Sequence, residues 1–146
     1  MGHVRGVVCL EWRRVWDGVR VKILILDDNQ ALRDAVGGIL KALGHAVDTT
    51  DDAHAAVKML VDGEYDFVLV DYKMPVTDGI WFMKNAQIPK RTKVLLMTAY
   101  VNKEVIAEMF DLGAVGYLIK PFDTEELVRH LEFHSDRHGA AAASPQ

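Results

Sequence analysis

The chain alternates short apolar runs with longer amphipathic segments, and this rhythm repeats five times. The short runs are typical of strands, and the longer segments, several of which stop at a glycine, are typical of helices. Strands are expected at Lys22–Leu26, His45–Thr49, Phe67–Val70, Lys93–Met97 and Tyr117–Ile119, and helices at Gln30–Leu43, Ala53–Val61, Gly79–Ala86, Lys103–Leu112 and Glu125–Phe133. Four of these strands are apolar throughout, which is typical of strands buried on both faces, and the less apolar second strand is expected at an edge. The pattern predicts an α/β fold of the (βα)5 type, a doubly wound five-stranded parallel sheet with helices on both faces.

Length, composition and charge limit the functions open to this chain. It has 146 residues, 50% of them hydrophobic, which suits one domain core. The formal net charge is −4 and the basic residues are scattered, so we expect no direct binding to nucleic acid. No apolar run approaches the roughly 20 residues of a membrane span, and the one cysteine, Cys9, cannot form an internal disulfide. These features predict a cytoplasmic protein with no membrane association.

Polar side chains follow four of the five expected strands, at the point where each strand ends. Asp27 and Asp28 follow the first strand, Asp71 the third, Thr98 the fourth and Lys120 the fifth. Because the carboxyl ends of parallel strands lie along one edge of a sheet, we expect these groups to meet where open α/β sheets bind ligands. Three neighbouring carboxylates raise one another's proton affinity, so the cluster calls for a compensating cation. Mg²⁺ is such a cation, since it binds a few carboxylates while keeping waters and taking a phosphate oxygen.

The other groups at this edge suit a phosphoryl group. Lys120 supplies a point charge, Thr98 supplies a hydroxyl donor, and an Asp carboxylate can act as the nucleophile. Together with a metal ion, these groups are what transfer of a phosphoryl group to Asp requires. Each residue also has a plainer interpretation: Asp27 or Asp28 as a helix N-cap, Thr98 as an ordinary strand residue, and Lys120 as a solvated surface lysine.

Four segments make the sequence resemble a receiver domain of the bacterial two-component response regulators. They are ILILDDN (residues 23–29), LVDYKMPVTDG (69–79), LLMTAY (95–100) and GYLIKPF (116–122). The resemblance covers about residues 21–134 and implies a flavodoxin-like sheet with strand order 2-1-3-4-5. It also implies a signalling switch that catalyses only its own phosphorylation and dephosphorylation, and not an enzyme that turns over a metabolite.

Carried over position by position, the resemblance implies a phosphoryl acceptor and a metal site. Asp71 would accept the phosphoryl group and would also contact Mg²⁺. Asp28 would bind the metal directly, and Asp27 would act through a bound water. The backbone carbonyl of Lys73 would complete the set of protein ligands.

The resemblance further implies how phosphorylation is sensed. Thr98 would bond one phosphoryl oxygen and Lys120 another, with the peptide bond between Lys120 and the proline that follows in the cis form. Tyr117 would turn inward as Thr98 moves. Lys73 and Tyr100, two positions after Asp71 and Thr98, are expected to tune the lifetime of the phosphoryl group.

The implied partners are proteins. The donor would be a phosphohistidine on a sensor histidine kinase or a histidine phosphotransfer protein, docking at the helix Gln30–Leu43. The downstream target, which the sequence does not identify, would bind the surface made by helix Lys103–Leu112, strand Tyr117–Ile119 and helix Glu125–Phe133. Tyr117 lies at the centre of that surface.

The sequence divides into three parts on this interpretation. Residues 1–20 form an N-terminal extension, for which packing on the domain, recruitment of a partner, disorder and a mis-assigned start all stay open. Residues 21–134 form the receiver domain, and residues 135–146 form a flexible tail rich in Ala, Ser and Pro. With no output module after the last helix, the chain is expected to be a stand-alone receiver. His130, His134 and His138 recur at helical spacing, but the helix is expected to fray at Ser135, so no metal site is expected there.

Two alternatives belong to other classes of protein. One is a receiver-like interaction module that works without phosphate, against which the intact Asp28, Asp71, Thr98 and Lys120 argue. The other is a Mg²⁺-dependent phosphohydrolase of the haloacid-dehalogenase type. That type keeps a second Asp two residues after the nucleophile, whereas Lys73 stands there in this chain.

Overall fold

The computed structural model describes residues 20–74, 78–99 and 102–135. Five parallel strands form one sheet in the order β2-β1-β3-β4-β5. The strands are β1 (Lys22–Leu26), β2 (Ala46–Thr50), β3 (Phe67–Asp71), β4 (Lys93–Thr98) and β5 (Ala114–Ile119). The helices are α2 (Gln30–Ala42), α3 (Ala53–Asp62), α4 (Gly79–Asn85), α5 (Lys103–Asp111) and α6 (Thr124–His134). The predicted α/β class and strand order are confirmed.

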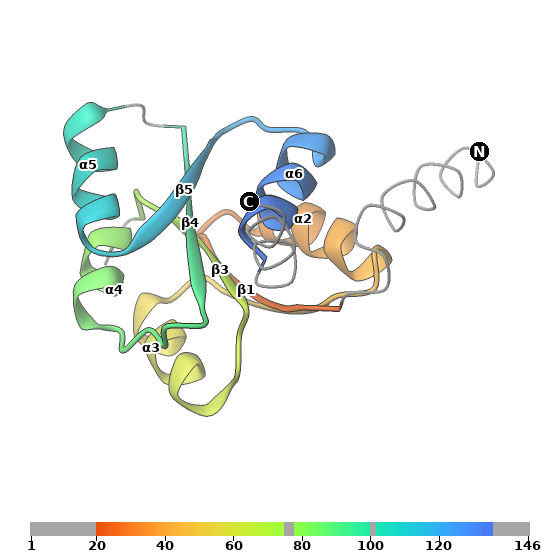
Figure 1. Ribbon diagram of the computed structural model, residues 1–146, viewed down its shortest axis with the longest axis horizontal. Helices are drawn as coiled ribbons and strands as arrows, with labels where there is room; N and C mark the ends of the chain where they lie inside the picture. Colours follow the sequence, from red (N-terminus) through yellow and green to blue (C-terminus); the bar gives the residue numbers. More distant parts are fainter. Residues whose placement is uncertain (1–19, 75–77, 100–101, 136–146) are drawn as a thin grey trace, which may run out of the picture.

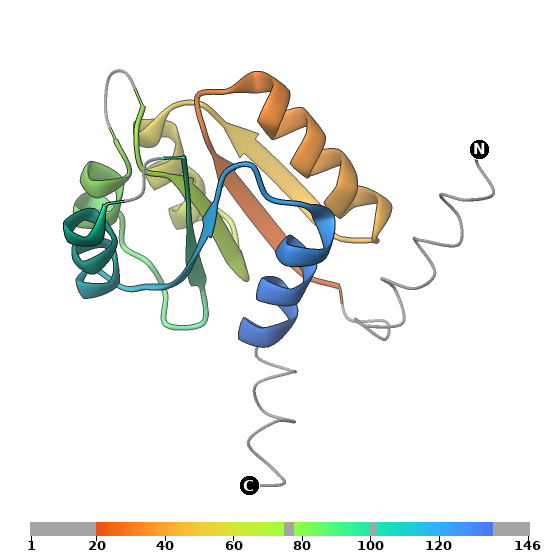
Figure 2. The same cartoon turned by 90° about the horizontal axis from the view of Figure 1, so that it is seen from above.

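Helices cover both faces of the sheet, with α2 and α6 on one face and α3, α4 and α5 on the other (Figures 1 and 2). Each face buries its own apolar core. Ile23 and Ile25 of β1 belong to the core under α2 and α6, while Leu24 and Leu26 belong to the core on the opposite face. Successive strand residues point to opposite faces, so a strand covered on both sides is apolar throughout. This explains the unbroken apolar run of β1.

Strand β5 differs from its prediction in length and in burial. It begins at Ala114, not Tyr117, and its residues alternate between buried and exposed. β5 is an edge of the sheet, and Val115, Tyr117 and Ile119 on it are partly exposed. The expectation that this strand is buried on both faces was therefore wrong. Gly116 hid the strand in the sequence, because a residue with no side chain adds nothing to an apolar pattern.

The helices begin where a side chain satisfies free backbone N–H groups. Asp52 caps α3 and Asp78 caps α4. The N-cap of α6 is Asp123. Asp123 accepts the N–H of Glu126 at 2.8 Å, and the Glu126 carboxylate reaches back to the Asp123 N–H. This reciprocal capping box holds the turn that follows β5.

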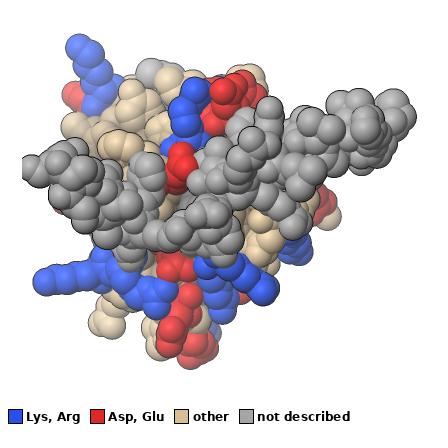
Figure 3. All heavy atoms as spheres, turned by 45° about the vertical axis from the view of Figure 1, so that its right-hand side comes forward, with Lys and Arg blue, Asp and Glu red and all other residues tan. Residues whose placement is uncertain are grey.

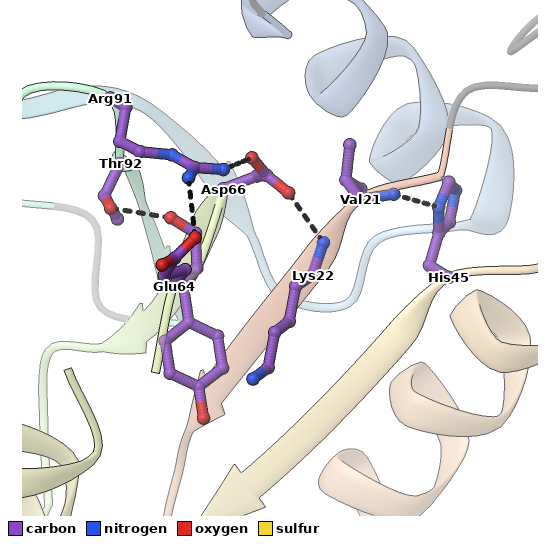
Figure 4. A network of polar contacts seen from close by, with 8 residues as sticks. Val21, Lys22, His45, Glu64, Asp66, Arg91 and Thr92 are labelled. Atoms are coloured by element: carbon purple, nitrogen blue, oxygen red, sulfur yellow. Dashed lines mark hydrogen bonds and ion pairs between the residues drawn. The ribbon is translucent and has the colours of Figure 1, made fainter. Parts of the chain in front are cut away.

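Polar contacts fix the starts of the strands at the edge opposite the site (Figure 4). The Asp66 carboxylate, just before β3, accepts the backbone N–H of Lys22 at 2.8 Å and pairs with Arg91. The backbone N–H of Val21 donates to Nδ1 of the buried His45 at 3.2 Å. These contacts join the first residues of β1 to the segments before β2, β3 and β4. They hold the strands in the register that aligns their carboxyl ends.

Candidate functional site

The carboxyl edge of the sheet brings the predicted residues together. β3 and β4 pair with Asp71 opposite Met97, and β4 and β5 pair with Thr98 opposite Ile119, the residue before Lys120. Oxygens of Asp27, Asp28 and Asp71 lie within 4.8 Å of one another. The predicted cluster of three carboxylates at this edge is therefore present.

Asp27 is the buried member of the adjacent pair. Its side chain is 0% exposed, and Oδ1 accepts the backbone N–H of Asn29 at 2.9 Å. Asp28 is exposed to solvent. Asn29 caps α2, since its Oδ1 accepts the N–H of Leu32 at 3.0 Å. Neither Asp27 nor Asp28 serves as the N-cap, so that plainer interpretation is excluded.

Lys120 reaches into the cluster and is not a solvated surface lysine. Its Nζ lies 2.7 Å from Oδ2 of Asp27 and 3.4 Å from Oδ1 of Asp71, and its side chain is 18% exposed. The backbone N–H of Lys120 donates to the carbonyl of Thr98 at 2.9 Å, and the peptide bond to Pro121 is cis, as predicted. One ammonium faces three carboxylates, so the site retains an excess of negative charge.

The environment of Asp71 opposes ionisation of its carboxyl group. Burial raises the pKa of Asp71 most, and the negative charge of Asp27 raises it further, while Lys120 lowers it. The resulting pKa is about 6, against an ordinary value of 3.8. Asp71 is therefore mainly ionised at neutral pH, in a site that stabilises its negative charge poorly. A bound cation would remove this disadvantage.

The donor set fits a hard divalent cation. Asp27, Asp28 and Asp71 offer carboxylate oxygens, which Mg²⁺ prefers, and the exposed Asp28 leaves the cluster open to solvent. Among the described residues, no other group of three His, Cys, Asp or Glu side chains is arranged to hold a metal ion.

Of the remaining predicted residues, the structure describes Thr98, Lys73 and Tyr117. Thr98 is 1% exposed at the end of β4, and Lys73 is exposed two residues after Asp71. Tyr117 is 38% exposed on β5, with its ring edge-on to Phe110 of α5 at 6.1 Å between centroids. Tyr100 lies outside the described residues.

Asn29 and Gly79 are not among the predicted site residues, yet both shape the site. Asn29 caps α2 and leaves both neighbouring carboxylates for the cluster; an Asn directly before a helix is a favoured cap, so the signal was present. A Cβ at Gly79 would lie 2.8 Å from the backbone carbonyl oxygen of Asp71, a distance that real Cβ atoms do not show. Glycine at residue 79 thus lets α4 start against the end of β3.

Figure 3 shows Lys and Arg interspersed with Asp and Glu on the described part of the face it presents. Such a mixed face differs from the basic stripe that phosphate backbones require. In the described part of the chain, no helix is long and apolar enough to cross a membrane.

Comparisons with known proteins identify the family of this chain. Residues 23–132 match the family model described as the response regulator receiver domain. The Chemotaxis protein CheY-3 of Vibrio cholerae is 37% identical over 116 residues, which are 77% of this chain and 89% of that protein.

Solved structures show the same fold. The Vibrio cholerae chemotaxis protein CheY4 superposes with a TM-score of 0.72 at 30% identity, covering 77% of this chain and 97% of that one. The response regulator protein TrrA of Thermotoga maritima, solved in complex with Mg²⁺-BeF, superposes with a TM-score of 0.66 at 28% identity and covers 76% and 96% of the two chains. On its sequence, its fold and its carboxylate cluster, the chain belongs to the family of response regulator receiver domains.

Proposed function

We propose that Asp71 accepts a phosphoryl group and that its phosphorylation switches the chain between two signalling states. Receiver domains are signalling proteins and not classical enzymes. The observation that carries the proposal is the convergence of three carboxylates and the Lys120 ammonium at the carboxyl edge of the sheet. Asn29, and no member of this cluster, caps α2.

In the proposed step, a carboxylate oxygen of Asp71 attacks the phosphorus of a phosphohistidine. An O–P bond forms, the P–N bond to the donor imidazole breaks, and the imidazole leaves with the electron pair and takes up a proton. Lys120, held between Asp27 and Asp71, is placed to pair with an oxygen of the transferred group. The Thr98 hydroxyl, at the end of the neighbouring strand, donates to another oxygen once transfer is complete.

The proposed metal is Mg²⁺, which the solved TrrA structure holds together with BeF. Asp28 and Asp71 would bind it through their carboxylates, Lys73 through its backbone carbonyl, and Asp27 through water. When bound, Mg²⁺ neutralises charge on the carboxylates and on the phosphoryl oxygens. The excess of negative charge at the site supports this assignment, as does the raised pKa of Asp71.

The proposed output is a change of the surface formed by α5, β5 and α6. Thr98 and Tyr117 lie on adjacent strands, so movement of Thr98 toward the phosphoryl group would open space for the Tyr117 ring. In the structure Tyr117 is 38% exposed, and its ring contacts that of Phe110. An inward turn of this ring would alter the surface offered to a partner. Phosphorylation would shift the balance between two conformations that both exist beforehand.

The proposed donor is a sensor histidine kinase or a histidine phosphotransfer protein in the cytoplasm. It would approach the open side of the cluster at Asp28, next to α2. The downstream partner would be a protein, and we propose that residues 21–134 suffice for both contacts, with residues 1–20 and 135–146 as appendages.

Lys73 and Tyr100 are proposed to set the lifetime of the phosphoryl group. Lys73 is exposed and two residues from the acceptor, where its side chain can hinder the attacking water or, through its amine, attract it. The rate of hydrolysis of the phosphorylated protein should therefore change in Lys73→Ala, and it should rise in Tyr100→Ala. Unchanged rates in both variants would refute this role.

The direct test is the intact mass of the protein after incubation with acetyl phosphate and Mg²⁺. One added phosphoryl group is expected, and it should be absent in Asp71→Asn and in the presence of a chelator. If the folded protein shows no adduct and does not form a stable beryllofluoride complex either, it acts without phosphate and the proposal is wrong.

A further inference from the structure

A groove between β5 and α6 contains two histidines that the proposed phosphoryl chemistry does not use. Its lining is mainly apolar and includes Phe110, Tyr117, Ile119 and Phe133, with His130 and His134 among them. Helix α6 continues through His134, so both histidines lie on regular helix, one turn apart. Residues four apart on a helix share one face.

The two imidazoles open onto the same space. Their ring centroids are 6.2 Å apart and their planes differ by 27°. The point that a Cβ at Gly116 would occupy lies 3.0 Å from Nε2 of His134, 3.0 Å from Cδ2 of Leu95 and 3.6 Å from Nδ1 of His130. Because residue 116 is glycine, no side chain of its own fills this space, which Leu95 of β4 also borders. A nitrogen from each ring therefore borders one small volume beside β5.

The chemistry of these rings suits a metal ligand. Within the described residues, neither imidazole forms a hydrogen bond or an ion pair. Burial lowers the pKa of both, and the charges of His130 and Lys93 lower that of His134 further. The charge of Glu126 raises the pKa of His130, and the charge of Arg129 lowers it. Neutral imidazole is the form that binds metal ions.

We infer that His130 and His134, above Gly116, form a two-imidazole site for a borderline divalent transition-metal ion such as Zn²⁺. Two histidines at i and i+4 on one helical face are a recurring way to bind Zn²⁺. Water or a side chain of a bound partner completes the coordination. Mg²⁺ does not compete, because it prefers oxygen ligands. The sequence-based expectation of no metal site depended on including His138, which the pair does not need.

The position of this site connects it to signalling, a consequence that depends on the proposed function. Tyr117, the proposed switch residue, lines the same groove. An ion held by α6 over β5 would fix the imidazoles on that wall of the groove. The site itself does not depend on phosphorylation, and its binding test is independent of phosphoryl transfer.

The test is a calorimetric titration of the full chain with Zn²⁺ at neutral pH in excess Mg²⁺, which occupies the carboxylate cluster. One Zn²⁺ per chain is expected. His130→Gln and His134→Gln should each weaken binding at least about tenfold, since loss of even an outer-shell partner costs a metal site that much. Matched controls are His138→Gln and His54→Gln, which should bind as the wild type does.

A further variant tests the geometry without removing a ligand. Gly116→Ala puts a methyl group 3.0 Å from Nε2 of His134, so it should also weaken Zn²⁺ binding. Circular dichroism of each variant confirms that it is folded. Absence of Zn²⁺ binding by the wild type, or equal binding by the His130 and His134 variants, would overturn the inference, as would loss of binding in the His138 variant alone.

Discussion

Replacing Asp71 by asparagine is expected to stabilise the fold at neutral pH when divalent cations are absent. The pKa of Asp71 is raised from 3.8 to about 6, first by burial and then by Asp27. The native state therefore holds this proton more tightly than the unfolded chain does. The free energy of unfolding consequently falls as pH rises from 3.8 to about 6. At about 1.4 kcal/mol per pKa unit, the shift destabilises the native state by about 3 kcal/mol above pH 6.

Asparagine carries no charge, so Asp71→Asn removes this penalty. Urea denaturation in the presence of a chelator should show the variant to be more stable by up to about 3 kcal/mol at neutral pH. In a domain of this size such a gain raises the melting temperature by roughly 10 °C. Near pH 4 the difference should vanish, because Asp71 is then protonated in the native wild type. Asp34→Asn, which neutralises an exposed carboxylate on α2, is the matched control.

Mg²⁺ should narrow the difference in stability between Asp71→Asn and the wild type, because it binds the native wild type and stabilises it by mass action. Equal stability of Asp71→Asn and wild type at neutral pH, without metal, would refute the electrostatic argument. A difference of the same size at pH 4 would refute it too, since the gain would then come from packing and not from the charge.

Three further substitutions test other contacts, each by urea denaturation. The pKa of His45 is lowered from 6.5 to about 4, so stability present above pH 6.5 is lost as pH falls toward 4, by about 3 kcal/mol; His45→Gln should lack this loss. Lys120→Met leaves the buried Asp27 without its cation and should destabilise the fold by about 3–5 kcal/mol at neutral pH. Gly79→Ala forces a Cβ against the carbonyl of Asp71 and should cost about 1–3 kcal/mol.

Each of these substitutions has an outcome that contradicts its rationale. For His45, the difference between wild type and variant must change between pH 6.5 and pH 4, and a constant difference would exclude titration of His45 as the cause. Lys120→Met with wild-type stability would mean that the Asp27 contact at 2.7 Å contributes nothing. If Gly79→Ala unfolds in urea at the same midpoint as the wild type, the approach of α4 to β3 is not tight.

The parts of the fold that the sequence predicts best are those where the pattern and the environment agree. β1 and β3 are covered on both faces, so their unbroken apolar runs indicate buried strands directly. The polar groups of the site follow these runs, and parallel topology alone places them at one edge. Asp27, Asp71 and Lys120 could therefore be grouped without knowing any contact between them.

What the sequence did not reveal depends on contacts between distant residues. That Asp27 and not Asp28 is the buried carboxylate follows from the Lys120 ion pair, which joins residues far apart in the chain. The predicted range of β5 is too short because the exposed side of the strand and Gly116 break the apolar pattern. The shared space of His130 and His134 depends on the same glycine in a neighbouring strand, which spacing along α6 cannot show.

The most direct test of the central claim is to identify the residue that carries the phosphoryl group. Borohydride reduces an aspartyl phosphate to homoserine, so peptide mass mapping after treatment with acetyl phosphate, Mg²⁺ and borohydride reports the acceptor. Homoserine is expected at residue 71 and at neither residue 27 nor residue 28. Homoserine at another position, or a phosphorylated protein with an unmodified Asp71, would contradict it.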